Sequence, residues 1–427
     1  MQSLYEKFLQ HPVICTDTRK LSNGCLFFAL KGDNFNGNKF ADQALKEGAA
    51  YVIVDEKEYA LNDQCIFVDD VLTALQQLAS YHRKQLNIPV IALTGSNGKT
   101  TSKELIASVL KQKFNVLYTL GNLNNHIGVP LTLLQLTAAH EMAVIEMGAN
   151  HQKEIELLCN IANPDYGLIT NVGKAHLEGF GGFEGVKKGK GELYQYIKQK
   201  KAHLFVNVDN GHLVSMLNAY DNVTWYGTIS GDVQGVAAGE SSLLDVQVNH
   251  PFNQYIKTNL TGDYNLENIL AAVAIGDYFK INQEEIKKGI ESYFPSNQRS
   301  QIIKKANNIT LVLDAYNANP SSMNAALDNF DKSFSGKKII ALGDMLELGS
   351  ESEREHFNIA QKVAGFKDTF VVLVGPKFES AAKKFYFRHF KTSAEAAAFI
   401  NTEYFRDYTI LIKGSRGIKM EVIAELI

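Results

Sequence analysis

Cysteine, proline and tryptophan are scarce in this chain of 427 residues, which has 4 Cys, 8 Pro and 1 Trp. The cysteines have neither the spacing of a metal site nor that of a disulfide framework; they are Cys15, Cys25, Cys65 and Cys159. Free thiols in a reducing cytoplasm are therefore the expectation. No tract is Pro-rich, which excludes a rigid extended linker between domains.

An excess of positive charge is also lacking. The 43 Lys and Arg residues are balanced by 46 Asp and Glu residues, which leaves a formal charge of −3, so no basic field favours nucleic acid or anionic lipid. No apolar run has the length of a membrane span, and the N-terminal segment, with Glu6 and Lys7, lacks the apolar stretch of a signal peptide. We expect a cytoplasmic monomer with small-molecule partners.

The length suggests about three domains of about 150 residues each. Residues 1–85 predict a small α/β domain, residues 86–296 a parallel sheet covered by helices, and residues 297–427 a doubly wound, Rossmann-like domain. Strands are expected at 88–93, 143–146, 166–170, 203–208 and 223–226 in the second domain, and at 309–313, 338–342, 369–374 and 408–412 in the third.

The strongest chemical signal is the segment Thr94-Gly-Ser-Asn-Gly-Lys-Thr-Thr101, between an apolar strand and an amphipathic helix. Small residues let backbone N–H groups face an anion, the lysine can reach terminal phosphates and the next threonine can bind Mg²⁺. The general phosphate-loop pattern would place its first glycine at Leu93, and an ordinary turn is the alternative. The flanking strand and helix favour a site for ATP or GTP, with candidates Gly95, Asn97, Gly98, Lys99, Thr100 and Thr101.

Three further residues are candidates for metal or proton chemistry. Glu146 closes an apolar strand, where a carboxylate could bind Mg²⁺ or simply be solvated. His176, in the loop after strand 166–170, could bind a metal or transfer a proton, although a lone histidine is more often structural. Lys190 belongs to a lysine cluster that composition alone would assign to a solvated surface.

Seven segments in one order resemble the Mur ligases. They are Thr94–Thr100, Gly121-Asn-Leu-Asn-Asn-His-Ile-Gly-Val-Pro130, Glu146-Met-Gly-Ala149, Ala175-His-Leu-Glu-Gly-Phe-Gly181, Asp314-Ala-Tyr-Asn-Ala-Asn-Pro320, Leu342-Gly-Asp-Met-Leu-Glu-Leu-Gly349 and Lys413-Gly-Ser-Arg416. The segments at 314–320 and 342–349 resemble the family's ligase for D-alanyl-D-alanine. The implied reaction joins that dipeptide to a UDP-linked muramoyl tripeptide, through an acyl phosphate made from ATP.

The resemblance also implies roles at matching positions. Lys99 and Thr100 would hold the β and γ phosphates and one Mg²⁺, Glu146 would bind that ion, and His176 would bind a second. Lys190 would be carbamylated, which converts an ammonium group into a carboxylate-like metal ligand. The predicted catalytic residues are thus Lys99, Glu146, His176 and Lys190. The predicted metal ligands are Thr100, Glu146, His176 and Lys190.

Nucleotide and substrate contacts are implied in the same way. Adenine and ribose would meet Asn265, Asn268, Arg299 and Asp314. Substrate contacts are expected from Thr18, Arg19, Asn122, Asn124, Asn125, Tyr316, Asn317, Asn319, Lys413, Ser415 and Arg416. Only 7 of the 43 basic residues are arginine, and Arg19, Arg299 and Arg416 lie in matched segments, where bidentate contacts to phosphate or carboxylate favour Arg over Lys.

Two other functions compete with this interpretation. A nucleotide-dependent regulatory ATPase would hydrolyse ATP without an amine, but it would leave the third-domain segments unexplained. Another ligase of the same family, such as folylpolyglutamate synthetase, would use a different acceptor. The choice of acceptor amine distinguishes the three functions.

Overall fold

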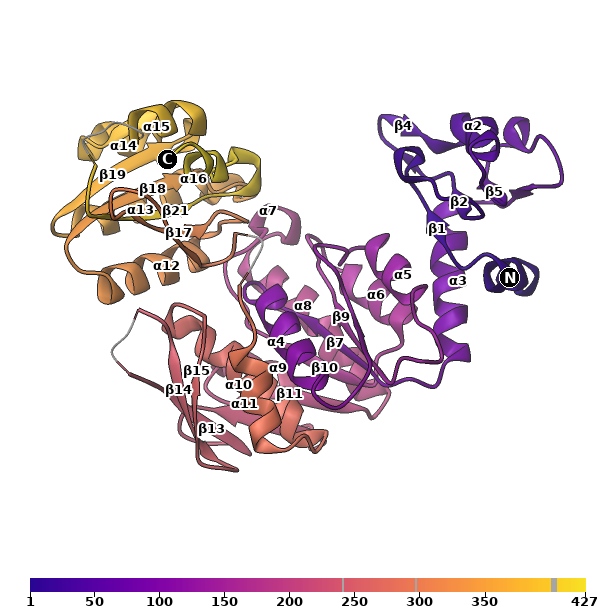
Figure 1. Ribbon diagram of the computed structural model, residues 1–427, viewed down its shortest axis with the longest axis horizontal. Coiled ribbons are helices and arrows are strands. Elements are labelled where there is room, and N and C mark those ends of the chain that lie inside the picture. Colours follow the sequence, from indigo (N-terminus) through magenta and orange to yellow (C-terminus); the bar gives the residue numbers. More distant parts are fainter. Residues whose placement is uncertain (240–241, 296–297, 401–404) are drawn as a thin grey trace.

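The computed structural model describes residues 1–239, 242–295, 298–400 and 405–427, and it folds the chain into three lobes that follow one another in sequence (Figure 1). Each lobe is built on its own sheet, of four, nine and six strands in chain order. This arrangement confirms the predicted three-domain α/β fold. The boundaries at 85/86 and 296/297 stay predictions, and the second lies at residues 296–297, outside the described residues.

The first lobe contains a small parallel sheet in the order β1-β2-β5-β6. Its strands are β1 (Ile14–Cys15), β2 (Leu26–Phe28), β5 (Tyr51–Val54) and β6 (Cys65–Phe67), accompanied by the hairpin β3 (Lys31–Gly32) and β4 (Phe35–Asn36) and the helices α1 (Gln2–Gln10) and α2 (Ala41–Lys46). Strand β2 is buried along its length, as expected for a short apolar strand covered on both faces.

Helix α3 (Val71–Gln85) joins the first lobe to the second (Figure 1). Asp70 caps it by accepting a hydrogen bond from the Thr73 N–H group at 2.6 Å. Its apolar residues, including Leu75 and Leu78, are buried between α1 and β2 on one side and α5 and α6 on the other. The two lobes therefore share an apolar core along this helix.

The second lobe is organised around a nine-stranded sheet in the order β15-β14-β13-β12-β11-β10-β7-β9-β8. Its strands are β7 (Val90–Thr94), β8 (Val116–Tyr118), β9 (Met142–Glu146), β10 (Tyr166–Ile169), β11 (His203–Asn207), β12 (Val223–Gly227), β13 (Val233–Ala238), β14 (Asp245–His250) and β15 (Gln254–Lys257). Its helices are α4 (Lys99–Leu110), α5 (Gly128–Leu133), α6 (Glu154–Ala162), α7 (Leu177–Phe180), α8 (Phe183–Gln199), α9 (Gly211–Leu217), α10 (Leu266–Tyr278) and α11 (Gln283–Glu291). All five strands predicted for this domain are present.

Strands β13, β14 and β15 were not predicted. They extend the parallel sheet with antiparallel pairs, β13 with β14 and β14 with β15. In β13 and β14 buried positions alternate with more exposed ones instead of forming a continuous apolar run. Such one-sided strands give a weaker sequence signal than strands buried on both faces.

The third lobe has a six-stranded sheet in the order β16-β17-β21-β18-β19-β20, parallel except for the edge strand β16. Its strands are β16 (Gln301–Lys304), β17 (Thr310–Asp314), β18 (Lys337–Gly343), β19 (Thr369–Val374), β20 (Arg388–Phe390) and β21 (Tyr408–Lys413), and its helices are α12 (Pro320–Ser333), α13 (Ser352–Ala364), α14 (Glu379–Phe385), α15 (Ser393–Ile400) and α16 (Glu421–Leu426). All four predicted strands are present. Across the described residues, no helix has the length and apolar character needed to cross a membrane.

The end of α3 is held against the second lobe by an ion pair in which the arginine is buried. The Arg83 guanidinium donates to the Asp165 carboxylate at 2.8 Å and to the Ala162 carbonyl oxygen at 3.1 Å, and its side chain is 6% exposed. Lys200 contacts the same carboxylate at 2.8 Å from a more exposed position. The two cations thus share one partner but differ in burial.

We predict that Arg83→Met lowers the free energy of unfolding by about 2 kcal/mol, because the buried Ala162 carbonyl group and the partly exposed Asp165 carboxylate lose a charged donor. Lys200→Met is the matched control and should cost about 0.5 kcal/mol, since exposed ion pairs contribute little. Denaturant unfolding of both variants measures the difference. Equal losses would contradict the assignment of Arg83 as the buried connection between the lobes.

Candidate active site

A cavity of about 630 Å³ lies between the second and third lobes. Loops that follow β7, β9 and β10, together with the start of α10, line one side, and the loop after β17, the start of α12 and the last residue of β21 line the other. Ligands of parallel α/β sheets bind at this edge, beyond the carboxyl ends of the strands. The cavity wall includes most predicted site residues, namely Asn97, Gly98, Lys99, Thr100, Thr101, Asn122, Asn124, Asn125, Glu146, His176, Asn265, Asn268, Arg299, Asp314, Tyr316, Asn317, Asn319 and Lys413.

The loop between β7 and α4 has the conformation that an anion site requires. Gly95 has a φ of 150° and Gly98 a φ of 77°, so the chain turns sharply before the helix begins at Lys99. The first N–H groups of a helix have no acceptor within it, and here they lie at the cavity wall. The helix dipole adds positive potential at the same place.

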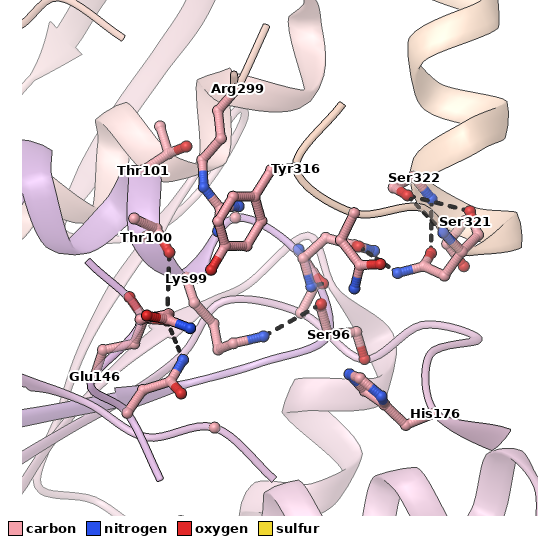
Figure 2. Close-up of a pocket in the computed structure, with 18 of the residues that line it drawn as sticks. Ser96, Lys99, Thr100, Thr101, Glu146, His176, Arg299, Tyr316, Ser321 and Ser322 are labelled. Atoms are coloured by element: carbon pink, nitrogen blue, oxygen red, sulfur yellow. Dashed lines mark hydrogen bonds between the residues drawn. The ribbon is translucent and has the colours of Figure 1, made fainter. Parts of the chain in front are cut away.

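Lys99 extends along this loop (Figure 2). Its Nζ donates to the carbonyl oxygens of Gly95 at 2.7 Å and Ser96 at 3.4 Å. Burial lowers the pKa of Lys99, while the nearby Glu146 carboxylate opposes that shift. A bound polyphosphate would favour the charged form of Lys99 further.

Glu146 has one oxygen engaged and one without a hydrogen bond. Its Oε1 accepts from Thr100 Oγ1 at 3.3 Å and from Asn124 Nδ2 at 2.7 Å. Its Oε2 is buried without a hydrogen-bond partner, and the Lys103 ammonium lies 4.0 Å away. A hydroxyl and an orphaned carboxylate oxygen beside a phosphate loop fit Mg²⁺, which takes few protein ligands and completes its shell with phosphate and water.

The other two predicted metal ligands are placed differently. His176 lines the cavity, and its Nδ1 contacts the Glu347 carboxylate of the third lobe. Lys190, on α8, is buried behind the wall, and its Nζ donates to the Ala149 carbonyl oxygen at 3.2 Å. Within the described residues, no three His, Cys, Asp or Glu side chains form a preformed metal cluster. The metal-binding roles of His176 and Lys190 stay predictions.

The environment of Lys190 is unusual for a lysine. Burial lowers its pKa well below the ordinary range, and the positive charge of Lys99 lowers it further. These surroundings therefore disfavour the charged ammonium form of Lys190. An uncharged lysine amine is a nucleophile, which is the form that reacts with carbon dioxide.

The third lobe contributes stacked and paired cations. The Arg299 guanidinium lies 3.8 Å from the centre of the Tyr316 ring, and Arg416 lies 5.2 Å from the same ring. In Figure 2, Arg299 and Tyr316 lie beside each other, and Arg299 is near enough to Lys99 to lower the pKa of that lysine. Lys413 Nζ pairs with Asp314 Oδ2 at 2.5 Å. Planar guanidinium groups held in this way suit phosphate or carboxylate ligands.

Asparagines connect the phosphate loop and its helix to other elements. Asn268 Oδ1 accepts from Ser102 Oγ at 2.9 Å, and its Nδ2 donates to Asn265 Oδ1 at 2.9 Å, which ties α10 to α4. From the third lobe, Asn319 Nδ2 donates to Asn97 Oδ1 at 2.8 Å. The predicted nucleotide contacts therefore also hold the loop in position.

Some predicted residues lie outside the cavity wall. Thr18 and Arg19 belong to the first lobe, where Arg19 pairs with Asp17 at 2.7 Å and is largely exposed. Gly95, Lys190, Ser415 and Arg416 lie next to the wall residues. Sequence reasoning missed other lining residues, including Ser96, His126, Asn150, Glu154, Asn171, Tyr264, Glu267, Ser300, Ser321 and Ser322. Two of these residues could have been selected from their positions in the sequence. Asn171 directly follows a predicted strand, and Glu267 lies between two predicted contacts.

Comparison with known proteins decides the family. Three family profiles match in order: the Mur ligase family catalytic domain at residues 12–83, the Mur ligase middle domain at 93–276 and the Mur ligase glutamate ligase domain at 298–416. The chain belongs to the Mur ligase family. This confirms the resemblance seen in the sequence.

Relatives of this Mur ligase share its full length. The UDP-N-acetylmuramoyl-tripeptide–D-alanyl-D-alanine ligase of Bacillus subtilis is 36% identical, over 99% of this chain and 94% of its own. A crystal structure of MurF from Acinetobacter baumannii matches with a TM-score of 0.88 and 35% identity, covering 97% of this chain and 92% of that one. MurF ligase from Thermotoga maritima in complex with ADP matches with a TM-score of 0.86 and 26% identity, covering 98% and 97%.

We predict that Gly95→Ala weakens ADP binding by about tenfold or more, because overpacking must displace the loop. An added Cβ would lie 2.0 Å from Thr170 Oγ1 and 3.2 Å from the Asn171 nitrogen. Gly336→Ala is the control, since its φ of 84° is also positive but no atom lies within 4 Å of the new Cβ. Calorimetric titration with ADP compares the two variants, and equally strong binding would contradict the loop assignment.

Proposed function

We propose that this Mur ligase joins the amine of D-alanyl-D-alanine to the terminal carboxylate of UDP-N-acetylmuramoyl-tripeptide, with conversion of ATP to ADP and phosphate. The observation that carries the proposal is a phosphate loop on one lobe that faces the Arg299–Tyr316 and Lys413–Asp314 pairs of another lobe across a single cavity. The full-length identity to ligases of that name supports the choice of substrates.

The chemistry follows from these parts. The tripeptide carboxylate attacks the γ-phosphorus of ATP, an acyl phosphate forms and ADP leaves. The dipeptide amine then attacks the acyl carbon, and phosphate leaves as the amide forms. Lys99 and the N–H groups at the start of α4 offset negative charge on the transferred phosphoryl group. Because water would destroy the acyl phosphate, the two lobes must enclose it.

Thr100 and Glu146 are the residues we expect to hold Mg²⁺, which would neutralise phosphate charge when bound. His176 is the proposed ligand of a second ion. Lys190 is proposed to be carbamylated, because burial and the charge of Lys99 lower the pKa of its amine and disfavour the charged form. A carbamate would replace a disfavoured buried cation with an anion suited to a metal.

The remaining expectations form part of the same proposal. We propose that Asn265, Asn268, Arg299 and Asp314 contact the nucleotide and that Thr18 and Arg19 contact the uridine diphosphate. The division at residues 85/86 and 296/297, the cytoplasmic location and the monomeric state stay predictions.

A panel of acceptor amines tests the function. With ATP, Mg²⁺ and the UDP-linked tripeptide, we predict phosphate release about 100-fold faster with D-alanyl-D-alanine than with glutamate, because a site shaped for one acceptor rejects another. Release that needs no amine would favour the regulatory ATPase. Faster release with glutamate would favour another ligase of the family.

The Lys99→Ala variant tests whether this phosphate release depends on the phosphate loop. Turnover should fall about 10³-fold, because the cation that faces the transferred group is lost. The thermal midpoint should change little, since Lys99 Nζ bonds only to two loop carbonyl groups in the described structure. Retained turnover would contradict the loop's role in catalysis.

We predict that Lys190→Ala lowers ligation by about 100-fold and that short carboxylic acids partly restore it by occupying the carbamate position. Lys188→Ala is the matched control, because Lys188 is exposed on the same helix and should have ordinary activity. Carbon-13 NMR after incubation with labelled bicarbonate should show a carbamate that is absent in Lys190→Ala. Absence of that signal from the unsubstituted enzyme would refute the modification.

A further inference from the structure

Glu267 is a carboxyl group of the cavity wall to which the mechanism above gives no role. It lies in the first turn of α10, between Asn265 and Asn268. Burial raises its pKa to about 7, while hydrogen bonds from Asn171 and Asn207 oppose the shift. Burial of a carboxyl group costs free energy of folding, so its place here points to the site rather than to stability.

The contacts of Glu267 lead to the phosphate loop. Asn171 Nδ2 donates to Glu267 Oε1 at 2.7 Å, and Asn207 Nδ2 lies at a longer 3.4 Å from Oε2. The other end of the Asn171 side chain faces the loop, where its Oδ1 accepts from the Asn97 N–H group at 3.0 Å. The Asn171 carbonyl oxygen also accepts from the Ser96 N–H group at 3.0 Å.

The chemistry of these groups selects one orientation of the Asn171 amide. An asparagine side chain has a donor end and an acceptor end of nearly the same shape, so packing alone does not distinguish them. A carboxyl group offers an acceptor oxygen in either protonation state, and a backbone N–H group only donates. Glu267 on one side and Asn97 on the other therefore fix the amide with its nitrogen toward α10 and its oxygen toward the loop.

We propose that Glu267 is a positioning residue of the nucleotide site, which orients Asn171 so that this residue holds the Ser96–Asn97 segment in the shape that receives phosphates. The proposal rests on the proposed function, since it needs the nucleotide to bind at this loop. Thr170 Oγ1 donates to the Asn97 carbonyl oxygen at 2.6 Å, so the end of β10 holds this segment through two adjacent residues.

Two substitutions at position 267 separate positioning from simple packing. Glu267→Leu removes the acceptor at similar volume and should weaken ADP binding, measured calorimetrically with Mg²⁺ present, by about tenfold, which is the usual effect of one lost hydrogen bond. Glu267→Gln retains an acceptor oxygen for Asn171 and should stay within about threefold of the unsubstituted protein. The thermal midpoint of Glu267→Leu should not fall. In steady-state assays, the KM for ATP should rise more than kcat falls.

A double-mutant cycle tests the route through Asn171. Asn171→Ala should match Glu267→Leu, and the double variant should bind no more weakly than either, because both remove the same constraint. Asn207→Ala is the control. Of the two asparagine contacts to Glu267 it removes the longer one, so this variant should bind ADP normally. Normal binding by Glu267→Leu, weak binding by Glu267→Gln, or additive losses would each overturn the proposal. An unsubstituted chain that binds no ADP would instead overturn the proposed function and, with it, this role.

Discussion

Positive charge held away from water is the constraint on which this site depends. Lys190 is buried and Lys99 is partly buried, and the charge on Lys99 disfavours a charge on Lys190. Arg299 adds to the same imbalance, because it also lowers the pKa of Lys99. Cations crowded in this way are costly until an anion arrives, so a bound phosphate and the carbamate proposed at Lys190 would both lower that cost.

The phosphate loop is held from several directions, which prepares it for its ligand. The end of β10 braces it through Thr170 and Asn171, and Asn319 reaches Asn97 from the third lobe. Asn268 of α10 bonds the first turns of α4. Because these contacts hold the loop in one conformation, they limit the binding free energy that is spent on ordering it.

Sequence reasoning succeeded where the signal was local. The phosphate loop, its strand and its helix are contiguous, so small residues and apolar runs were sufficient to place Lys99 and Thr100. The partners of these residues come from far along the chain: Ser102 bonds Asn268, and His176 contacts Glu347. Composition and periodicity do not show which distant residues meet in space. Asn171 and Glu267 were therefore missed, although one follows a predicted strand and the other lies between two predicted contacts. The family resemblance supplied Arg299 and Asp314, which spacing alone would not have selected.

The contacts that join the second and third lobes around the cavity are made by the site's own polar residues. Asn97 bonds Asn319, His176 contacts Glu347, and Lys174 pairs with Glu355 at 2.7 Å in the same region. A nucleotide that engages Asn97, or a metal ion that engages His176, must therefore compete with or reorganise contacts that set the position of the third lobe. The first lobe is joined differently, through the shared apolar core of α3. Polar rim contacts exchange with water and ligand at little net cost, whereas apolar burial does not. The first lobe is therefore held by apolar burial along α3, whereas the third lobe is held around the cavity by polar contacts that a ligand can replace.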